Sequence, residues 1–145
     1  MMALEQQSLG AAHWSRQQYD KLFQSQYIPQ PSKRFAWVAE DGDPPAIIGF
    51  LVSHNLVSHN IDQEWELENI AVAEPARRRG VGTLLLSELI AHARTGGGSE
   101  IFLEVRESNQ NARALYRRLG FQQQGSRKNY YSNPTEDAAL YRLKL

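Results

Sequence analysis

Three segments in the first half of the chain are rich in aromatic and β-branched residues and are separated by turn-forming residues. They span residues 34–40, 46–54 and 65–72. Segments of this length and composition predict β-strands. Residues 41–45 read Asp-Gly-Asp-Pro-Pro, which predicts a turn between the first two strands. We therefore expect an antiparallel meander.

The pattern changes to a helical period in the second half of the chain. Residues 81–94 place four apolar side chains on one stripe, namely Leu86, Leu89, Ile90 and Ala93. Three glycines at 96–98 follow, as expected beyond a helix C-terminus. Residues 101–105 are nearly all apolar, which is typical of a strand buried on both faces of a parallel pair. The order strand, helix, strand predicts a right-handed crossover.

Two further helices and a strand pair complete the expected fold. Residues 11–26 predict a helix that ends before Pro29. Ser108 is a candidate N-cap for another helix, whose apolar stripe comprises Ala112, Leu115, Tyr116 and Leu119 and which ends at Gly120. Residues 121–131 and 138–145 predict a C-terminal pair of strands. The sum is an α/β fold with a mixed sheet in a single domain over residues 1–145.

Composition narrows the classes of function. Sixteen basic residues balance sixteen acidic ones, whereas a nucleic-acid-binding protein usually has a basic excess. The chain has no cysteine, which excludes disulfides, thiolate nucleophiles and zinc–cysteine sites. No apolar run approaches the roughly 20 residues of a membrane span, and the N-terminus lacks the pattern of a signal peptide. We expect a cytoplasmic protein with no nucleic-acid or membrane partner.

A pentapeptide occurs twice in tandem, as Leu-Val-Ser-His-Asn at residues 51–55 and 56–60. The two histidines, His54 and His59, would point to opposite faces of a strand. The sequence offers no carboxylate cluster to support them as metal ligands. We interpret the repeat as a duplication that lengthens a hairpin, and we expect no metal site.

The loop before the helix at residues 81–94 is a candidate phosphate site. It comprises Arg77, Arg78, Arg79, Gly80, Val81, Gly82 and Thr83. The first turn of a helix has unpaired backbone N–H groups and a partial positive charge, and glycine allows an anion to approach closely. The alternative is a glycine-containing turn with a solvated basic surface. The loop matches neither the P-loop pattern nor the dinucleotide-binding fingerprint.

This loop and its neighbours resemble the GCN5-related N-acetyltransferase (GNAT) superfamily. The spacing Arg77-x-x-Gly80-x-Gly82 is similar to the superfamily's pyrophosphate loop, and residues 66–72 resemble the strand before it. Residues 103–121 are similar to its second signature. The resemblance is greatest to RimI-type enzymes, which acetylate the N-terminal alanine of a small-subunit ribosomal protein. It covers roughly residues 14–145.

The resemblance implies the GNAT fold, a mixed, mainly antiparallel sheet with a parallel crossover at its centre and flanking helices. It also implies acetyl-CoA as cosubstrate, held without a metal. The pantetheine arm would pair with the main chain near Ile70, Ala71 and Val72. Asn109 would hydrogen-bond the arm, while the backbone of the phosphate loop would take the diphosphate. Two departures are that residues 1–10 make an unconvincing first strand and that the tandem repeat lengthens a hairpin beside the acceptor.

Glu104 and Tyr116 are the candidate catalytic residues. Glu104 is a lone acid in an apolar strand, where burial would raise its pKa toward that of a useful base. It could instead be a strand-end acid paired with an arginine, and Glu66 and Glu68 are alternative bases. Tyr116 resembles the tyrosine that protonates the leaving thiolate, although its position in an apolar stripe also fits a core residue.

Three functions remain open from the sequence. The first is transfer of an acetyl group to a protein N-terminal α-amine, with a peptide or a ribosomal protein as partner. The second is acetylation of a small amine such as a polyamine or an antibiotic. The third is a non-catalytic acyl-CoA sensor, which the presence of a base, an acid and a phosphate loop disfavours. The sequence does not indicate an oligomeric state.

Overall fold

The computed structural model describes residues 32–57 and 63–145 of the chain. Its elements are β1 (Ser32–Asp41), β2 (Ala46–Val57), β3 (Gln63–Val72), the 3₁₀ turn η1 (Glu74–Ala76), α3 (Val81–Thr95), β4 (Gly98–Arg106), α4 (Gln110–Arg118), β5 (Gln122–Tyr131) and β6 (Glu136–Lys144). Each strand and helix predicted within these residues is present. The helix predicted over residues 11–26 lies outside the described residues.

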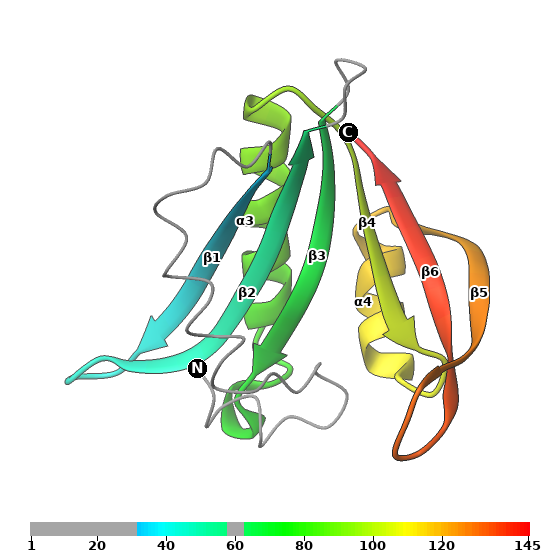
Figure 1. Ribbon diagram of the computed structural model, residues 1–145. Helices are drawn as coiled ribbons and strands as arrows, with labels where there is room; N and C mark the ends of the chain where they lie inside the picture. The colour runs from blue at the N-terminus through cyan, green and yellow to red at the C-terminus, as the bar shows by residue number, and fades with distance from the viewer. Residues whose placement is uncertain (1–31, 58–62) are drawn as a thin grey trace.

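The strands form one mixed sheet in the order β1-β2-β3-β4-β6-β5. Neighbouring strands are antiparallel except β3 and β4, which are parallel and joined through α3. The predicted fold class, an α/β sheet that is mainly antiparallel with a parallel crossover at its centre, is confirmed. Strand β6 returns between β4 and β5, so that β5 forms one edge of the sheet (Figure 1).

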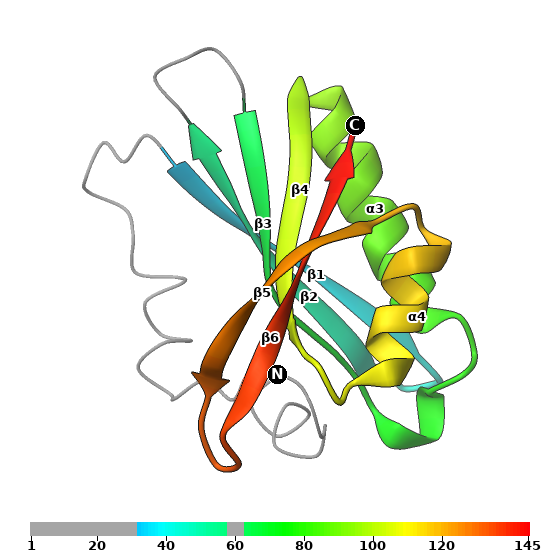
Figure 2. The same ribbon diagram turned by 90° about the vertical axis from the view of Figure 1, so that its right-hand side faces the viewer.

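Helices α3 and α4 lie on the same side of the sheet (Figure 2). The predicted stripe of α3 is buried against the sheet, and Leu86, Leu89 and Ala93 have no exposed surface. Strand residues of alternate positions, such as Trp65 and Ile101, complete this core. The intervening positions of β3 and β4 therefore point to the opposite face of the sheet.

The parallel strands β3 and β4 separate partway along their length. Their pairing ends with Leu67 opposite Leu103. Here β3 has one extra residue, Glu68, between the pairs that Leu67 and Asn69 form with β2. Such a bulge bends the strand, and Figure 1 shows β3 diverging from β4 toward the ends at which both strands finish. We call the divergence beyond Leu67 and Leu103 the splay.

The two copies of the pentapeptide lie in different surroundings. In the first copy Leu51, Val52 and Ser53 are fully buried. Strand β2 continues into the second copy through Leu56, which is only half-buried, and ends at Val57. The rest of the second copy, including His59, lies outside the described residues. Strand β2 thus extends from the first copy into the second, and the expectation that the duplication lengthens a hairpin stays a prediction.

Two details of the helix ends bear on the sequence predictions. The predicted cap of α4 at Ser108 is wrong, because Asn109 is the N-cap and its Oδ1 accepts a hydrogen bond from the backbone N of Ala112 at 3.2 Å. Asparagine and serine are similarly good caps, so their order could not be read from the sequence. Beyond α3, Gly97 has φ +76°, the left-handed geometry expected after a helix.

No helix among the described residues is long and apolar enough to cross a membrane.

Candidate active site

The predicted phosphate loop leads directly into the first turn of α3. The N-cap is Gly80, in the left-handed conformation with φ +83°, and no side chain of the described residues caps the helix. Within this part of the chain the first backbone N–H groups of α3 therefore lack a side-chain acceptor, as an anion site requires. An added Cβ at Gly80 would meet nothing within 4 Å, so its backbone angle rather than crowding calls for glycine.

The three arginines of the loop are not equivalent. Arg77 donates from Nε to the carbonyl oxygen of Val72 at 3.0 Å, which ties the loop to the end of β3. Arg79 pairs with Asp41 at 2.9 Å, and this pairing lowers the pKa of Asp41. Arg78 forms no ion pair with a carboxylate of the described residues and has φ +61°. Of the three, only Arg79 pairs with a carboxylate of the described residues, so Arg77 and Arg78 keep their positive charges for a ligand.

Three carboxylates lie where the splay begins, on the sheet face opposite α3 and α4. Glu66 and Glu68 are on β3, and Glu104 is on β4, one residue beyond the last paired position. Because the ends of β3 and β4 lead to the N-termini of α3 and α4, the carboxylates and both helix N-termini belong to the carboxyl end of the parallel pair. Ligands of open α/β sheets bind at such an end.

Glu68 contacts an arginine and a histidine from two other strands. Arg34 on β1 donates to both of its carboxylate oxygens at 3.0–3.1 Å, and His54 Nδ1 on β2 lies 3.8 Å from Oε1. Burial, and then Arg34, lower the pKa of His54. The histidine is therefore neutral near pH 7, and Arg34 is the counterion of Glu68.

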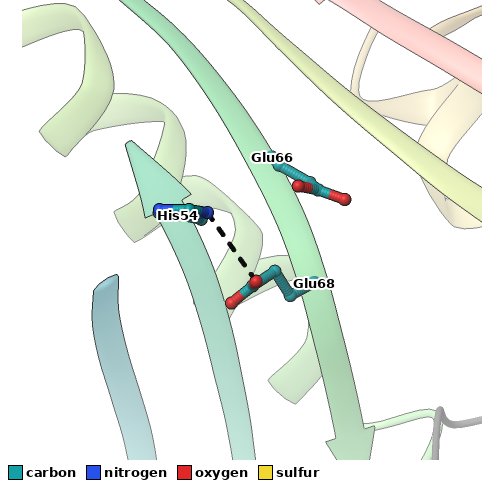
Figure 3. Close-up of side chains that lie close together, drawn as sticks. All are labelled: His54, Glu66 and Glu68. Carbon is teal, nitrogen blue, oxygen red and sulfur yellow. Dashed lines mark ion pairs between the residues drawn. The ribbon is translucent and has the colours of Figure 1, made fainter. Parts of the chain in front are cut away.

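The fold brings carboxylates to His54 that the sequence did not reveal. One ligand atom each of His54, Glu66 and Glu68 lies within 4.8 Å of the others. In Figure 3 Glu68 points toward His54, whereas Glu66 points the other way, toward β4. A metal ion would have to displace Arg34 from Glu68 and turn Glu66 around. We interpret the group as a charge network across the sheet.

Glu66 is the carboxylate with the most perturbed surroundings. Its pKa is raised by burial and then by the nearby charges of Glu68 and Glu104. Arg34 and Arg127 lower it in part, but neither forms an ion pair with Glu66, and no other described residue does. A half-buried carboxylate with a raised pKa can accept a proton from an amine near neutral pH.

Glu104 instead has a direct counterion. Its Oε1 lies 3.2 Å from Nε of Arg127 on β5, and Tyr130 hydrogen-bonds to it. The side chain of Glu104 is 19% exposed and that of Arg127 57% exposed. The alternative expected from the sequence, an acid paired with an arginine, is thus present, and the carboxylate still lies at the splay.

Tyr116 lies on the other side of the sheet, in α4. It is buried and packs against the rings of Phe121 and Tyr141, with centroids 5.8 and 6.1 Å away. Burial, and then Tyr131, raise its pKa well above that of an ordinary tyrosine. The hydroxyl is therefore always protonated near neutral pH, as a proton donor must be. The same packing makes Tyr116 part of the core.

The connection between β5 and β6 places two tyrosines next to Glu104. Tyr130 and Tyr131 meet edge to face at 5.1 Å. Arg106 at the end of β4 lies over the Tyr131 ring at 4.4 Å and donates to the carbonyl oxygens of Ser132 and Pro134. Burial and the charge of Glu104 raise the pKa of Tyr131 to about 12. Arg106 thus fixes the hairpin beside the site.

The remaining candidates for cofactor contact lie around the splay. Ile70 and Ala71 are paired with β2 and lie beyond the last pair that β3 forms with β4. Val72 ends the strand and accepts from Arg77. Asn109 uses its Oδ1 to cap α4, so only its amide N–H groups can serve a ligand.

Sequence reasoning missed the two cations of the site, Arg34 and Arg127, and the place of His54 beside Glu68. They come from strands far from the glutamates in the sequence, and no local pattern pairs them. One signal was available. Acidic residues occupy every second position of β3 at Glu64, Glu66 and Glu68, and a period of two places them on one face.

Comparisons with known proteins agree with this geometry. The model of the acetyltransferase (GNAT) family matches residues 2–121. The [ribosomal protein bS18]-alanine N-acetyltransferase of Salmonella typhimurium is 44% identical over 84 residues, which cover 57% of each chain. The crystal structure of the ribosomal-protein-S18-alanine N-acetyltransferase from Escherichia coli has a TM-score of 0.77 and 30% identity, covering 99% of this chain and 84% of that one.

The fold is shared by more distant structures as well. The NatC complex bound to Gag peptide and CoA matches with a TM-score of 0.82 at 24% identity, covering 99% of this chain and 87% of that chain. An open, splayed parallel pair beside a glycine-containing helix N-terminus defines an α/β fold that can hold an anionic cosubstrate. The chain belongs to the GNAT acetyltransferase family. Its match spans only about half of the length of the curated relative from Salmonella.

Proposed function

We propose that the protein transfers an acetyl group from acetyl-CoA to the N-terminal α-amine of a protein. One observation carries the proposal: the carboxylates of Glu66 and Glu104 lie at the start of the splay between β3 and β4. The family and the similar bS18-alanine N-acetyltransferases support it. A ribosomal protein is accordingly the expected acceptor, and the cytoplasm the expected location.

The chain's own residues would bind acetyl-CoA along the splay. Backbone N–H groups of residues 78–83 would take the diphosphate, because no side chain in the part of the chain that the structure describes caps α3. Ile70, Ala71 and Val72 would pair with the pantetheine arm, and an amide N–H of Asn109 would add a hydrogen bond. A backbone N–H at Ala71 or Val72 would stabilise the oxyanion.

The transfer itself needs a proton acceptor and a proton donor. Glu104 would take a proton from the acceptor's ammonium group, with Glu66 as the alternative base. The neutral amine would then form the new C–N bond as the C–S bond breaks, and the nitrogen would release its second proton to solvent. Tyr116 would protonate the departing thiolate, and solvent would restore both groups.

An α-amine fits this site better than a lysine side chain does. At pH 7 deprotonation costs about 4.6 kcal/mol for a lysine with a pKa near 10.4, but only about 1 kcal/mol for an α-amine near 7.8. A carboxylate paired with Arg127 is a modest base, so it suits the easier proton transfer. Tyr130 and Tyr131, beside Glu104, would border the entrance for a short extended peptide.

Two peptides of one sequence test the proposal. One has a free N-terminal alanine and no lysine, and the other has a blocked N-terminus and one internal lysine. We expect acetylation of the first peptide alone, measured by mass spectrometry with acetyl-CoA. Turnover confined to the lysine peptide would refute the α-amine assignment. Turnover of spermidine alone would establish the small-amine function instead.

A further inference from the structure

The pairing of Glu104 with Arg127 poses a problem for the proposed base. A guanidinium 3.2 Å from Oε1 of Glu104 covers one side of the carboxylate that the acceptor's ammonium group would approach. An ammonium group that binds at the same oxygen would compete with Arg127 for it. Movement of Arg127 away from Oε1 would resolve this competition.

The structure provides for this movement. Arg127 is 57% exposed, and exposed ion pairs contribute only about 0–1 kcal/mol. Its guanidinium also lies 5.4 Å from the ring centre of Tyr130, so it keeps a cation–π partner near the site. Displacing Arg127 from Glu104 is therefore inexpensive, and the side chain has an alternative contact.

Strand register directs Arg127 to Glu104, and an irregularity in β5 follows it. Leu140 pairs with both Glu104 and Gly125, and Arg127 lies two positions beyond Gly125 on the same face. Pairing with β6 is regular from Gly125 to Arg127, and it resumes only at Tyr131 opposite Glu136. Within the irregular stretch Asn129 has φ +53°, and its backbone N donates to Asp137 Oδ1 at 2.8 Å. Bulges next to active sites commonly redirect a side chain in this way.

We infer that Arg127 is a displaceable counterion of Glu104, and that the acceptor's ammonium group takes its place at the carboxylate. The inference rests on the proposed function, because it requires a cationic amine as acceptor. Without the acceptor, Arg127 neutralises the charge of Glu104. When the acceptor's amine binds, Arg127 leaves the carboxylate, and Glu104 can then accept a proton. Arg127 is a positioning residue that acts through Glu104.

A second glutamate of β4, Glu100, also pairs with an arginine, and this ion pair offers a matched control. Arg142 on β6 pairs with Glu100 on β4, and their side chains are 50% and 15% exposed. Both pairs join an exposed arginine to a largely buried glutamate of β4. Glu100, however, lies where β4 is still paired with β3. Replacement of Arg142 therefore removes a similar ion pair away from the splay.

The surrounding charges determine the expected pH effect of removing Arg127. The pKa of Glu66 is raised by burial and by the charges of Glu68 and Glu104, and Arg34 and Arg127 lower it. Without Arg127 the pKa of Glu66 should therefore rise further. His54 is neutral and Tyr130 stays protonated in the same range, since the pKa of each is shifted away from ionisation.

The test compares wild type, Arg127→Gln and Arg142→Gln on the peptide with a free N-terminal alanine. Initial rates are measured against peptide concentration and pH at saturating acetyl-CoA. We expect Arg127→Gln to lower the peptide KM about two- to fivefold, the range for an exposed ion pair. Its acid limb of kcat/KM should move to higher pH. Arg142→Gln should match wild type in both measurements.

The possible results separate the two proposals. An Arg127→Gln variant with the KM and acid limb of wild type would overturn the inference while the proposed function stands. A raised KM with an unmoved acid limb would also overturn it, because Arg127 would then hold the acceptor or the hairpin. If all three proteins bind acetyl-CoA but leave the peptide unmodified, the proposed function fails and the inference falls with it.

Discussion

Replacement of Glu104 by glutamine tests whether this carboxylate is the base that accepts the proton of the amine. The change keeps the size of the side chain and its place at the splay but removes the proton acceptor. We expect kcat at pH 7 to fall by about 10²–10⁴-fold, the usual contribution of a general base. Acetyl-CoA affinity should not change, because Glu104 lies at the acceptor end. Stability should change little, since the lost partner is an exposed arginine.

The pH dependence of this loss has a predicted size. An α-amine with a pKa near 7.8 is about 14% neutral at pH 7 and about 94% neutral at pH 9. The defect of Glu104→Gln should therefore shrink by up to about sevenfold between these pH values, because the amine then deprotonates without help. Stopped assays with acetyl-CoA and the alanine peptide measure this directly.

Two further variants complete the test of Glu104. Glu100→Gln is the control, because Glu100 also points from β4 and pairs with an arginine but lies away from the splay. It should retain the wild-type rate. If Glu104→Gln has the wild-type rate at pH 7 and Glu66→Gln does not, then Glu66 is the base and the assignment of Glu104 is refuted.

Five other substitutions test three separate parts of the structure. Tyr116→Phe should lower kcat and leave the melting temperature and acetyl-CoA affinity nearly unchanged, and an unaltered kcat would make Tyr116 a core residue only. Gly82→Glu should abolish acetyl-CoA binding by calorimetry, because its Cβ would lie 3.1 Å from Leu115 and its charge beside the diphosphate. Arg79→Ala should only weaken binding, because Arg79 is already paired with Asp41, and equal affinities in both variants would contradict the loop assignment. Gly98→Ala should destabilise the fold by about 1–3 kcal/mol, the usual cost of overpacking, since its Cβ would lie 2.8 Å from the Ala93 carbonyl oxygen. Gly125→Ala, with its nearest contact at 3.9 Å, should unfold in denaturant like wild type, and equal losses in the two variants would refute the crowding argument.

The elements that local patterns determine were predictable from the sequence. The stripe of Leu86, Leu89 and Ala93 identified α3 because a helix buries one face. The apolar run at residues 101–105 identified β4, but burial on both faces was wrong for the described residues, because only Ile101, Leu103 and Val105 of this run are buried. The proposed phosphate loop rests on its glycines and its place before a helix. Each of these features depends on neighbours within a few positions.

The charge network of the site was not predictable in the same way. Arg34 and Glu68 are 34 positions apart, and they meet only because β1, β2 and β3 align in a particular register. Arg127 reaches Glu104 because β4, β6 and β5 align in a particular register. The bulge at Glu68 that opens the splay also depends on the pairing with β2. Registers and bulges arise from the packed sheet as a whole, and single-strand patterns do not specify them.

The central claim is that acetyl-CoA lies in the splay with the acceptor's nitrogen at the carboxylates. The most direct test is a crystal structure with a bisubstrate compound in which CoA is joined to the N-terminal nitrogen of an alanine peptide. The account predicts the pantetheine arm between β3 and β4, the diphosphate at the first turn of α3, and the joined nitrogen within about 3.2 Å of Glu104 or Glu66, directly or through one water. A compound bound elsewhere, or a nitrogen directed away from both carboxylates, would contradict it.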